Sequence, residues 1–327
     1  MDIQGLNIPQ PGFGTYSNAA IAAIIQTVVF DANTLALPAG STFTRASSAT
    51  YFDNTGTLQI AANNMPRFDY NPSTLVFRGL LMEGASTNLF LNSQAPVTQT
   101  IALVNGQVYT LSFYGIGNIA YTGAATGTLT GTGTNDLVQV TFTAAGTSIL
   151  LTVAGLVLNA QLEAYPCASS RIITLGASAS RSNDLCTNPN VPWYNISSGT
   201  FIYEFINVGN GDGTFREVFG TDNGGFSESI QLSTATTANL SQIFHLGAFQ
   251  LNIGFTMIPL GLTKLGLTYS AAGGNRAQNG GSLTPYGAIM LPLMPTRFIM
   301  SGGFTWVRKI TYYSGQLSNA ALLAATL

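Results

Sequence analysis

The chain has 327 residues, with 11 lysines and arginines against 13 aspartates and glutamates, a formal net charge of -2, one histidine and two cysteines. Charged residues make up 7% of the sequence, against roughly 25% in an ordinary soluble domain. So few basic side chains exclude electrostatic binding to nucleic acid or to an anionic membrane surface. Hydrophobic residues, at 46%, are enough for a large core. The low charge predicts that much of the surface is buried against other subunits, because interface cores are depleted in Lys, Glu and Asp.

No membrane insertion is predicted. The longest apolar stretch, residues 19–30, is shorter than the roughly 20 residues that a membrane-spanning helix needs. The residues before it contain no Lys or Arg and do not resemble a secretory signal, which predicts synthesis in the cytoplasm. Cys167 and Cys186 have no CxxC spacing, so neither a metal site nor a cofactor is expected, and two buried thiols are favoured over a disulfide.

The predicted elements are almost all strands. An apolar stretch at 18–29 favours a short helix, and a second helix is expected at 318–325, where Ser318 can act as the N-cap. Between them, runs rich in Val, Thr, Leu and aromatic residues are separated by turn clusters such as Asn105-Gly106. Such short strands at regular spacing predict β-sandwiches. The strands are expected at 107–114, 137–143, 148–153, 200–206, 215–219, 242–249, 263–269, 297–300 and 305–313.

Shifts in composition divide the chain into four parts. Residues 1–40 are punctuated by Pro and Gly around one apolar patch, which is too small to form a core and must dock onto something else. Residues 41–95 form a dense transition segment. A small β domain is expected at 96–187, and a larger one at 193–327 after a short linker.

Residues 43–93 carry three motifs in fixed order: RASSATYFDNTG from Arg45, PRFDY from Pro66 and GLLMEGASTNL from Gly79. This segment resembles one found in bacteriophage virion fibres, spikes and related structural proteins. Family members usually continue into a small jelly-roll similar to carbohydrate-binding modules, which ends on motifs matched here by AQLEA from Ala160, SRIIT from Ser170 and RSND from Arg181.

The C-terminal part resembles the concanavalin A/laminin-G-like sandwich that often closes these proteins. Its matching motifs are WY from Trp193, GTF from Gly199, ITYY from Ile310 and LSNA from Leu317. The resemblance therefore implies a mostly β protein with an N-terminal anchor of extended chain and short helix, a small jelly-roll-like β domain and a C-terminal concanavalin A-like β-sandwich. Residues 1–40 match no family segment, as expected for a particle-specific anchor.

The function implied is that of a non-enzymatic structural component of the virion. The protein is expected to be a head or tail fibre or spike, a homotrimer attached to capsid or tail proteins through residues 1–40 and adhering to host surface polysaccharide. Many copies on one particle turn weak contacts into firm attachment. The alternative is a capsid decoration protein that stabilises the shell and binds no ligand. An enzymatic depolymerase spike ranks last.

Ionisable side chains gather in the transition segment, although they are rare elsewhere in the chain. Because arginine forms planar, bidentate pairs with carboxylates, we interpret them as a salt-bridged collar that fixes the anchor to the head; a ligand site is the alternative. The collar residues are Arg45, Asp53, Arg67, Asp69, Arg78 and Glu83.

Enzymatic sites find little support in the sequence. A sandwich glycanase needs paired carboxylates across a cleft, but the strand at 200–206 carries Glu204 alone. The single histidine, His245, lies in an apolar run and is expected to be packed rather than part of a Ser–His–Asp triad. The residues around Asp212 and Asp222 offer oxygen ligands for calcium, but tight turns explain them better.

Sugar binding requires aromatic ring faces with amide and hydroxyl groups rather than charge. The loop at 270–282 and two nearby rings offer this combination; the alternative is that the rings belong to the sandwich core and the loop is plain surface. The predicted glycan-binding residues are Tyr269, Asn275, Arg276, Asn279 and Trp306.

Overall fold

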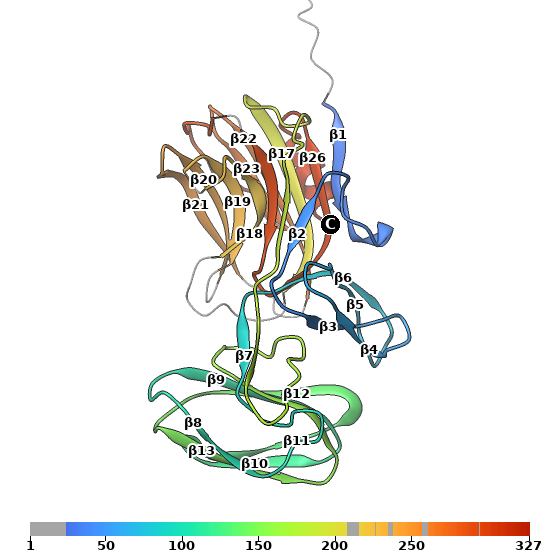
Figure 1. Ribbon diagram of the computed structural model, residues 1–327. Coiled ribbons are helices and arrows are strands. Elements are labelled where there is room, and N and C mark those ends of the chain that lie inside the picture. Colours follow the sequence, from blue (N-terminus) through green and yellow to red (C-terminus); the bar gives the residue numbers. More distant parts are fainter. Residues whose placement is uncertain (1–23, 208–215, 226, 235–237, 257–260, 294) are drawn as a thin grey trace, which may run out of the picture.

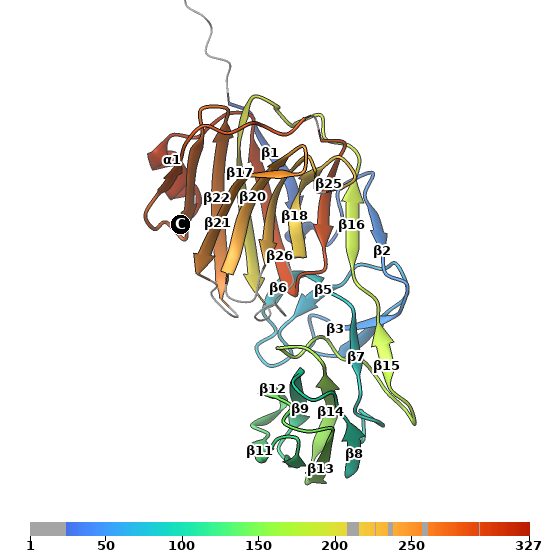
Figure 2. The ribbon, with the colours of Figure 1, turned by 90° about the vertical axis from the view of Figure 1, so that its left-hand side faces the viewer.

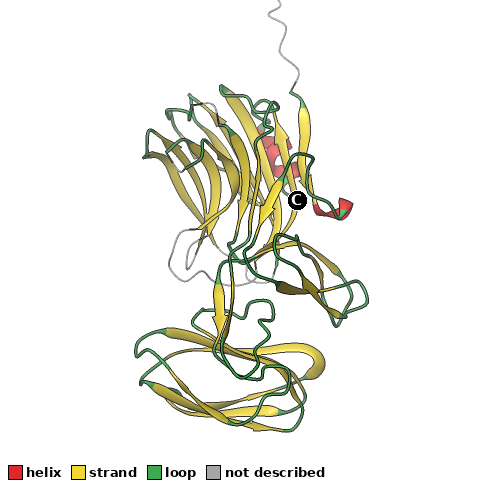
Figure 3. Cartoon of the chain, viewed as in Figure 1, coloured by secondary structure: helices red, strands yellow, loops and turns green. Residues whose placement is uncertain are grey.

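The computed structural model describes residues 24–207, 216–225, 227–234, 238–256, 261–293 and 295–327. Within these ranges helix is confined to a 3-10 turn, η1 (Ala32–Thr34), and one helix, α1 (Asn319–Ala325) (Figure 3). The predicted mostly β fold class is confirmed. Figure 1 shows a large and a small β body connected by a narrower region.

The large body is a sandwich of two antiparallel sheets. An eight-stranded sheet has the order β24-β23-β22-β17-β26-β6-β5, with β1 also paired to β26, and a seven-stranded sheet has the order β2-β16-β25-β18-β19-β20-β21. The first sheet contains β1 (Gln26–Asp31), β5 (Phe68–Tyr70), β6 (Phe77–Met82), β17 (Ser198–Asn207), β22 (Leu262–Ser270), β23 (Gly274–Gln278), β24 (Thr284–Tyr286) and β26 (Thr305–Tyr313). The second contains β2 (Thr42–Thr44), β16 (Leu185–Asn188), β18 (Arg216–Asp222), β19 (Ser229–Thr234), β20 (Ala238–His245), β21 (Ala248–Thr256) and β25 (Arg297–Ser301).

Aromatic rings fill the space between these two sheets. Phe201 and Tyr312 from the first sheet and Phe298 from the second are all buried. Trp193, in the approach to β17, stands edge-on to Phe201 at 6.2 Å and to Phe298 at 6.4 Å between ring centroids. Aromatic contacts of this kind add to the stabilisation that burial alone provides, and they fix the two sheets against each other.

The large sandwich is not confined to residues 193–327. It recruits β1, β2, β5 and β6 from the first quarter of the chain and β16 from the end of the predicted small domain. Val29, Phe30 and Ala32, which lie within the predicted arm at 1–40, are buried in the same core. The predicted boundaries at 40, 95 and 187 are therefore wrong as limits of the sandwich, because non-local strand pairing completes it.

Two local predictions are also corrected. Gln26 to Asp31 form strand β1, paired with β26, where part of a helix at 18–29 was expected; the residues before 24 lie outside the described ranges. The run at 242–249 is a hairpin and not one strand, since Leu246 and Gly247 have φ of 50° and 76° and turn the chain from β20 into β21. The C-terminal helix is confirmed: Ser318 caps α1 through a hydrogen bond from the Ala321 amide.

The small body is a jelly-roll-like sandwich. Its five-stranded sheet has the order β12-β9-β14-β7-β15 and its four-stranded sheet the order β11-β10-β13-β8. The strands are β7 (Ser86–Asn88), β8 (Gln99–Ala102), β9 (Val108–Gly115), β10 (Asn118–Gly123), β11 (Gly127–Thr130), β12 (Gly133–Thr143), β13 (Ser148–Ala154), β14 (Val157–Glu163) and β15 (Ala179–Arg181). Alternate residues of β9 and β13, such as Leu111, Phe113, Ile149 and Leu151, form its core.

Between the two bodies, the chain passes twice. We call this region, residues 45–88 on the way out and 164–184 on the way back, the joint. It contains the hairpin of β3 (Ala49–Phe52) and β4 (Leu58–Ala61). Strands β7 and β15, at the edge of the small body's five-stranded sheet, run side by side (Figure 2). Cys167, in the joint, and Cys186, just after it, are both buried and are not joined in a disulfide.

Candidate functional site at the joint

Buried ion pairs hold the two passages of the joint together. Arg45 Nη1 lies 3.1 Å from Asp184 Oδ1, and Arg67 Nη2 contacts the other oxygen of the same carboxylate. Glu83 Oε2 lies 2.7 Å from Arg67 Nη1 and 3.0 Å from Arg181 Nη1. All five side chains are at most 1% exposed. Asp184 and Arg181 come from the returning chain, so the network ties it to the outgoing chain.

The six predicted collar residues therefore separate into three groups. Arg45, Arg67 and Glu83 belong to the buried network. Asp53 does not, because its Oδ1 accepts hydrogen bonds from the amides of Thr55 and Thr57 and shapes the β3–β4 turn. The predicted single collar is incorrect in this respect. Arg181 and Asp184 were not among the predicted collar residues, although the RSND motif contains both.

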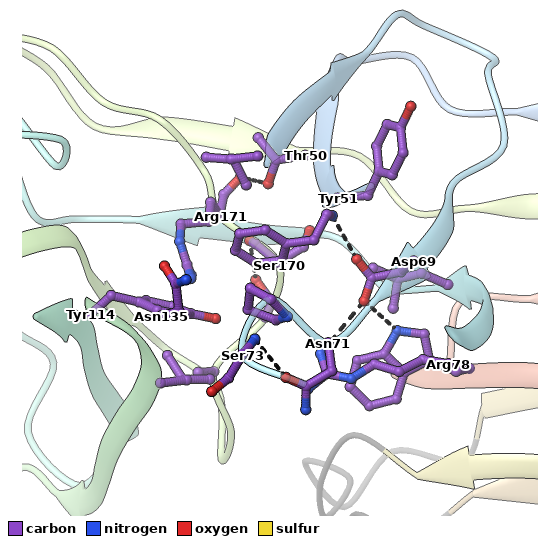
Figure 4. Close-up of a pocket in the computed structure, with 18 of the residues that line it drawn as sticks. Thr50, Tyr51, Asp69, Asn71, Ser73, Arg78, Tyr114, Asn135, Ser170 and Arg171 are labelled. Atoms are coloured by element: carbon purple, nitrogen blue, oxygen red, sulfur yellow. Dashed lines mark hydrogen bonds and ion pairs between the residues drawn. The ribbon is translucent and has the colours of Figure 1, made fainter. Parts of the chain in front are cut away.

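The third group, Asp69 and Arg78, lies in a pocket of about 380 Å³ that opens beside the network. Its wall combines residues of β3, β5 and β6 with β9 and β12 of the small sandwich and Trp306 on β26 of the large one. Figure 4 shows Asp69, Asn71 and Arg78 on one side of it and Tyr114, Asn135 and Arg171 on the other. All three regions of the fold are needed to form this pocket.

Asp69 organises the first side. Its Oδ1 accepts a hydrogen bond from the Phe52 amide at 2.8 Å, and its Oδ2 accepts one from Trp306 Nε1 at 2.9 Å. Arg78 Nη1 lies 3.6 Å from the same Oδ2, and the guanidinium lies 4.5 Å from the centroid of the Trp306 ring. Burial, the largest influence, raises the pKa of Asp69, while these hydrogen bonds and Arg78 oppose the rise.

Arg171 occupies the opposite side and is 4% exposed. Its guanidinium carbon lies 3.2 Å from the centroid of the Tyr114 ring and 5.3 Å from that of Phe52. Among the residues that the structure describes, it forms no ion pair, and its Nε and Nη2 have no hydrogen-bond acceptor. Burial lowers the pKa of Arg171 well below its ordinary value; Asp69 opposes this effect and Arg78 adds to it.

Neutral polar groups complete the pocket. Asn71, Ser73 and Thr74 come from the turn between β5 and β6, while Asn135 and Gln139 come from β12. Ser73 and Asn135 are exposed, and Asn71 is half-buried with its Oδ1 accepting hydrogen bonds from the amides of Ser73 and Thr74. The pocket thus offers amide and hydroxyl groups beside aromatic rings, with two guanidiniums within its wall.

The predicted glycan-binding residues do not form one site. Tyr269 is fully buried in the large core, where its hydroxyl contacts the hydroxyl of Tyr312 at 2.9 Å, so its role as a sugar platform is wrong. Arg276 is buried on β23 and donates to the Gly254 carbonyl at 2.6 Å. Asn275 and Asn279 support that strand and its turn, the latter by accepting from the Lys264 amide. Trp306 lies apart from them, in the joint pocket.

Only one of the five predicted residues thus contributes to the pocket, and the residues opposite it were missed. Arg171 and Tyr114 are 57 residues apart, and the sequence placed them in separate motifs. One signal in the sequence could have found Arg171. Because the chain has so few ionisable groups, the arginine of the SRIIT motif is expected to have a specific interaction partner.

Metal-binding clusters and membrane-spanning helices are both absent from the described residues. Within them, no group of three or more His, Cys, Asp and Glu side chains is placed to hold a metal ion. The same part of the chain contains no helix that is long and apolar enough to cross a membrane. Of the two loops for which calcium had been weighed against ordinary turns, one has its Asp222 engaged by Arg297 Nε at 2.6 Å, and the other, with Asp212, lies outside the described residues.

Comparisons with known proteins give a resemblance at the level of the fold. No family model and no curated protein matches the sequence. Similar solved structures include the binding domain of botulinum neurotoxin DC in complex with rat synaptotagmin II, with 8% identity and a TM-score of 0.35 over 44% of this chain and 40% of that one. Another is a botulinum neurotoxin type C structure concerned with cell entry through two ganglioside molecules, with 11% identity and a TM-score of 0.35 over 44% and 40%. The chain spans well under half the length of these structures, and likeness of this degree carries no inference about function.

Proposed function

We propose that this protein is a bacteriophage virion fibre or spike that adheres to host surface glycans, and that the joint pocket is its sugar-binding site. The observation that carries the adhesion proposal is the pocket itself. Ligand sites are concave, are lined largely by apolar and aromatic groups with a few polar groups, and often lie between domains. This pocket joins Trp306 and Tyr51 to Asn71, Ser73 and Asn135, at the meeting point of both sandwiches.

The assignment to a virion is supported by the resemblance of residues 43–93. Its motifs supply Arg45, Arg67 and Glu83 to the buried network, so the matched segment is the part that fixes the two sandwiches relative to each other. A rigid joint suits a fibre, because many weak sugar contacts add up only when the sites are held in a geometry that allows simultaneous binding.

The proposed attachment to capsid or tail proteins through residues 1–40 is restricted to a shorter segment of the chain. Residues from 26 onward belong to the large sandwich, so a docking arm would have to lie before β1. Ile24 and Ile25, at the start of the described chain, are 46% and 65% exposed. Exposed apolar side chains next to each other favour contact with a partner, which supports docking at this end of the sandwich.

The adhesion proposal is tested by binding of the full chain to immobilised bacterial surface polysaccharides. Ser73→Trp places a bulky ring in the pocket at an exposed position. Ser282→Trp is the matched control, since Ser282 is exposed in the loop at 270–282, away from the pocket. We expect Ser73→Trp to weaken binding at least about tenfold, or about 1.4 kcal/mol, and Ser282→Trp to leave it unchanged.

Two results would change the proposal. Absence of binding to every polysaccharide by the unmodified chain would favour the ligand-free decoration protein. Loss of binding in Ser282→Trp alone would return the site to the loop at 270–282. Static light scattering of the full chain tests the assembly separately: a mass of three chains supports a homotrimeric fibre, whereas a single chain favours a decoration protein that the shell organises.

A further inference from the structure

Arg171 differs from the other arginines buried in the joint. Arg45, Arg67 and Arg181 each reach a carboxylate within 3.1 Å. Arg171 is buried to a similar degree, but the described residues provide no carboxylate for it. A buried charge costs free energy unless it is paired and hydrogen-bonded, and the aromatic faces of Tyr114 and Phe52 offset only part of this cost.

The carboxylates around the pocket are already engaged, with one exception. Glu83 is paired with Arg67 and Arg181, and Asp69 is held by Trp306, the Phe52 amide and Arg78. Asp136 on β12 also lines the pocket but makes no ion pair with Arg171. Arg78, the second guanidinium, is 27% exposed at the side chain and lies 3.6 Å from Asp69 Oδ2, a carboxylate oxygen that also accepts a hydrogen bond from Trp306. The pocket wall therefore contains one buried guanidinium, that of Arg171, which no carboxylate of the described residues contacts.

We infer that the joint pocket selects acidic sugars, with the uncompensated guanidinium of Arg171 attracting the carboxylate of a uronic or sialic acid unit and Arg78 assisting from the opposite side. This inference rests on the proposed glycan adhesion and names its ligand class. A carboxylate is favoured because arginine binds it in a planar, bidentate arrangement with charge-assisted hydrogen bonds. Asn71, Ser73 and Asn135 would then bind hydroxyl groups of the same sugar.

If Arg171 serves to bind a ligand, its buried charge should lower the melting temperature of the ligand-free protein. Groups arranged for function rather than for stability reduce stability when the ligand is absent. Arg171→Met keeps the length of the side chain and its contact with the Tyr114 ring while it removes the buried charge. We therefore expect Arg171→Met to melt at the same temperature as the unmodified chain or higher. If the guanidinium had only a structural role, the variant would melt at a lower temperature.

The binding test compares an oligosaccharide that contains uronic acid with its carboxyl-reduced, neutral counterpart, by isothermal titration calorimetry on the full chain. Charge-assisted hydrogen bonds predict that the acidic form binds about tenfold tighter or more. In Arg171→Met and Arg171→Gln, this preference is expected to disappear. Asp136→Asn, which removes a carboxylate from the pocket wall, is expected to strengthen binding of the acidic form more than binding of the neutral form.

Each other outcome has a definite meaning. Equal binding of the acidic and neutral forms overturns the inference but leaves glycan adhesion standing. A preference that survives in both Arg171 variants overturns the role of Arg171. Equally tight binding of a sulfated oligosaccharide overturns selectivity for a carboxylate. If neither form of any polysaccharide binds, the proposed function fails, and the inference fails with it.

Discussion

Arg67 and Asp184 lie 117 residues apart in the chain, yet their side chains form an ion pair with no exposed surface. Arg67 belongs to the chain leaving the large sandwich, and Asp184 to the chain returning to it. The whole small sandwich is inserted between them. Because Asp184 also binds Arg45 and accepts a hydrogen bond from the Glu83 amide at 2.9 Å, one carboxylate fixes the position at which the insertion begins and ends.

Removing that carboxylate should destabilise the protein strongly. In Asp184→Asn, Arg45 and Arg67 lose their shared counter-ion in a buried environment, and breaking such a pair typically costs about 3–5 kcal/mol. The measurement is the free energy of unfolding from urea titration. Glu204→Gln is the control, because the Glu204–Lys264 pair is 4.0 Å apart and partly exposed and should contribute about 1 kcal/mol or less. Similar losses in both variants would contradict the importance of the network.

Acid should weaken the joint through Glu83. Burial by itself raises the pKa of Glu83, but Arg181, Arg67 and hydrogen bonds from Ser170 outweigh it and lower the pKa from its ordinary 4.5 to about 2. A carboxylate whose pKa is lower in the folded state stabilises it above the unfolded pKa, so this contribution is lost as pH falls from about 5 toward 2. It amounts to up to about 3 kcal/mol.

The difference in unfolding free energy between the unmodified chain and Glu83→Gln should therefore shrink as pH falls from 6 to 3. Glu163→Gln provides a control of opposite sign. Burial raises the pKa of Glu163, so its protonation favours the folded state and partly offsets the acid loss. Removing Glu163 should make the acid decline steeper, and a flatter decline in both variants would disprove the assignment.

Gly79 controls how β6 docks onto β26. Its φ is 130°, and a Cβ atom there would lie 2.5 Å from the Val307 carbonyl oxygen. Gly79→Ala therefore adds a steric clash to an unfavourable backbone conformation, and we expect a loss of about 3 kcal/mol or more in thermal or urea unfolding. Gly106 also has a positive φ, of 82°, but with nothing within 4 Å of the added atom. Gly106→Ala should lose only about 1 kcal/mol, and an equal loss at both positions would exclude the clash as the cause.

Local patterns in the sequence predicted the class of the fold and most of its strands, because alternation and β-branched residues act over a few neighbours. The strand predicted at 305–313 coincides with β26, and Ser318 caps α1. The same reasoning failed at 26–29, where an apolar stretch without clear periodicity became a strand only through pairing with β26. It also joined β20 and β21, since the turn at Leu246 carries no strong breaker before Gly247.

The sequence by itself determined that this is a β-rich protein with few charges, and that the motif segment at 43–93 carries several of its ionisable groups. Only the tertiary structure decided which of those charges meet. It gave Arg45 and Arg67 a common partner in Asp184 and placed Trp306 in a pocket away from the loop with which it had been grouped. On the opposite side of that pocket it placed Arg171, which no carboxylate in the described part of the chain contacts. These relationships depend on contacts between residues more than a hundred positions apart. Propensity and spacing act locally, so they do not specify such contacts, whereas the packing of two sandwiches around one joint does.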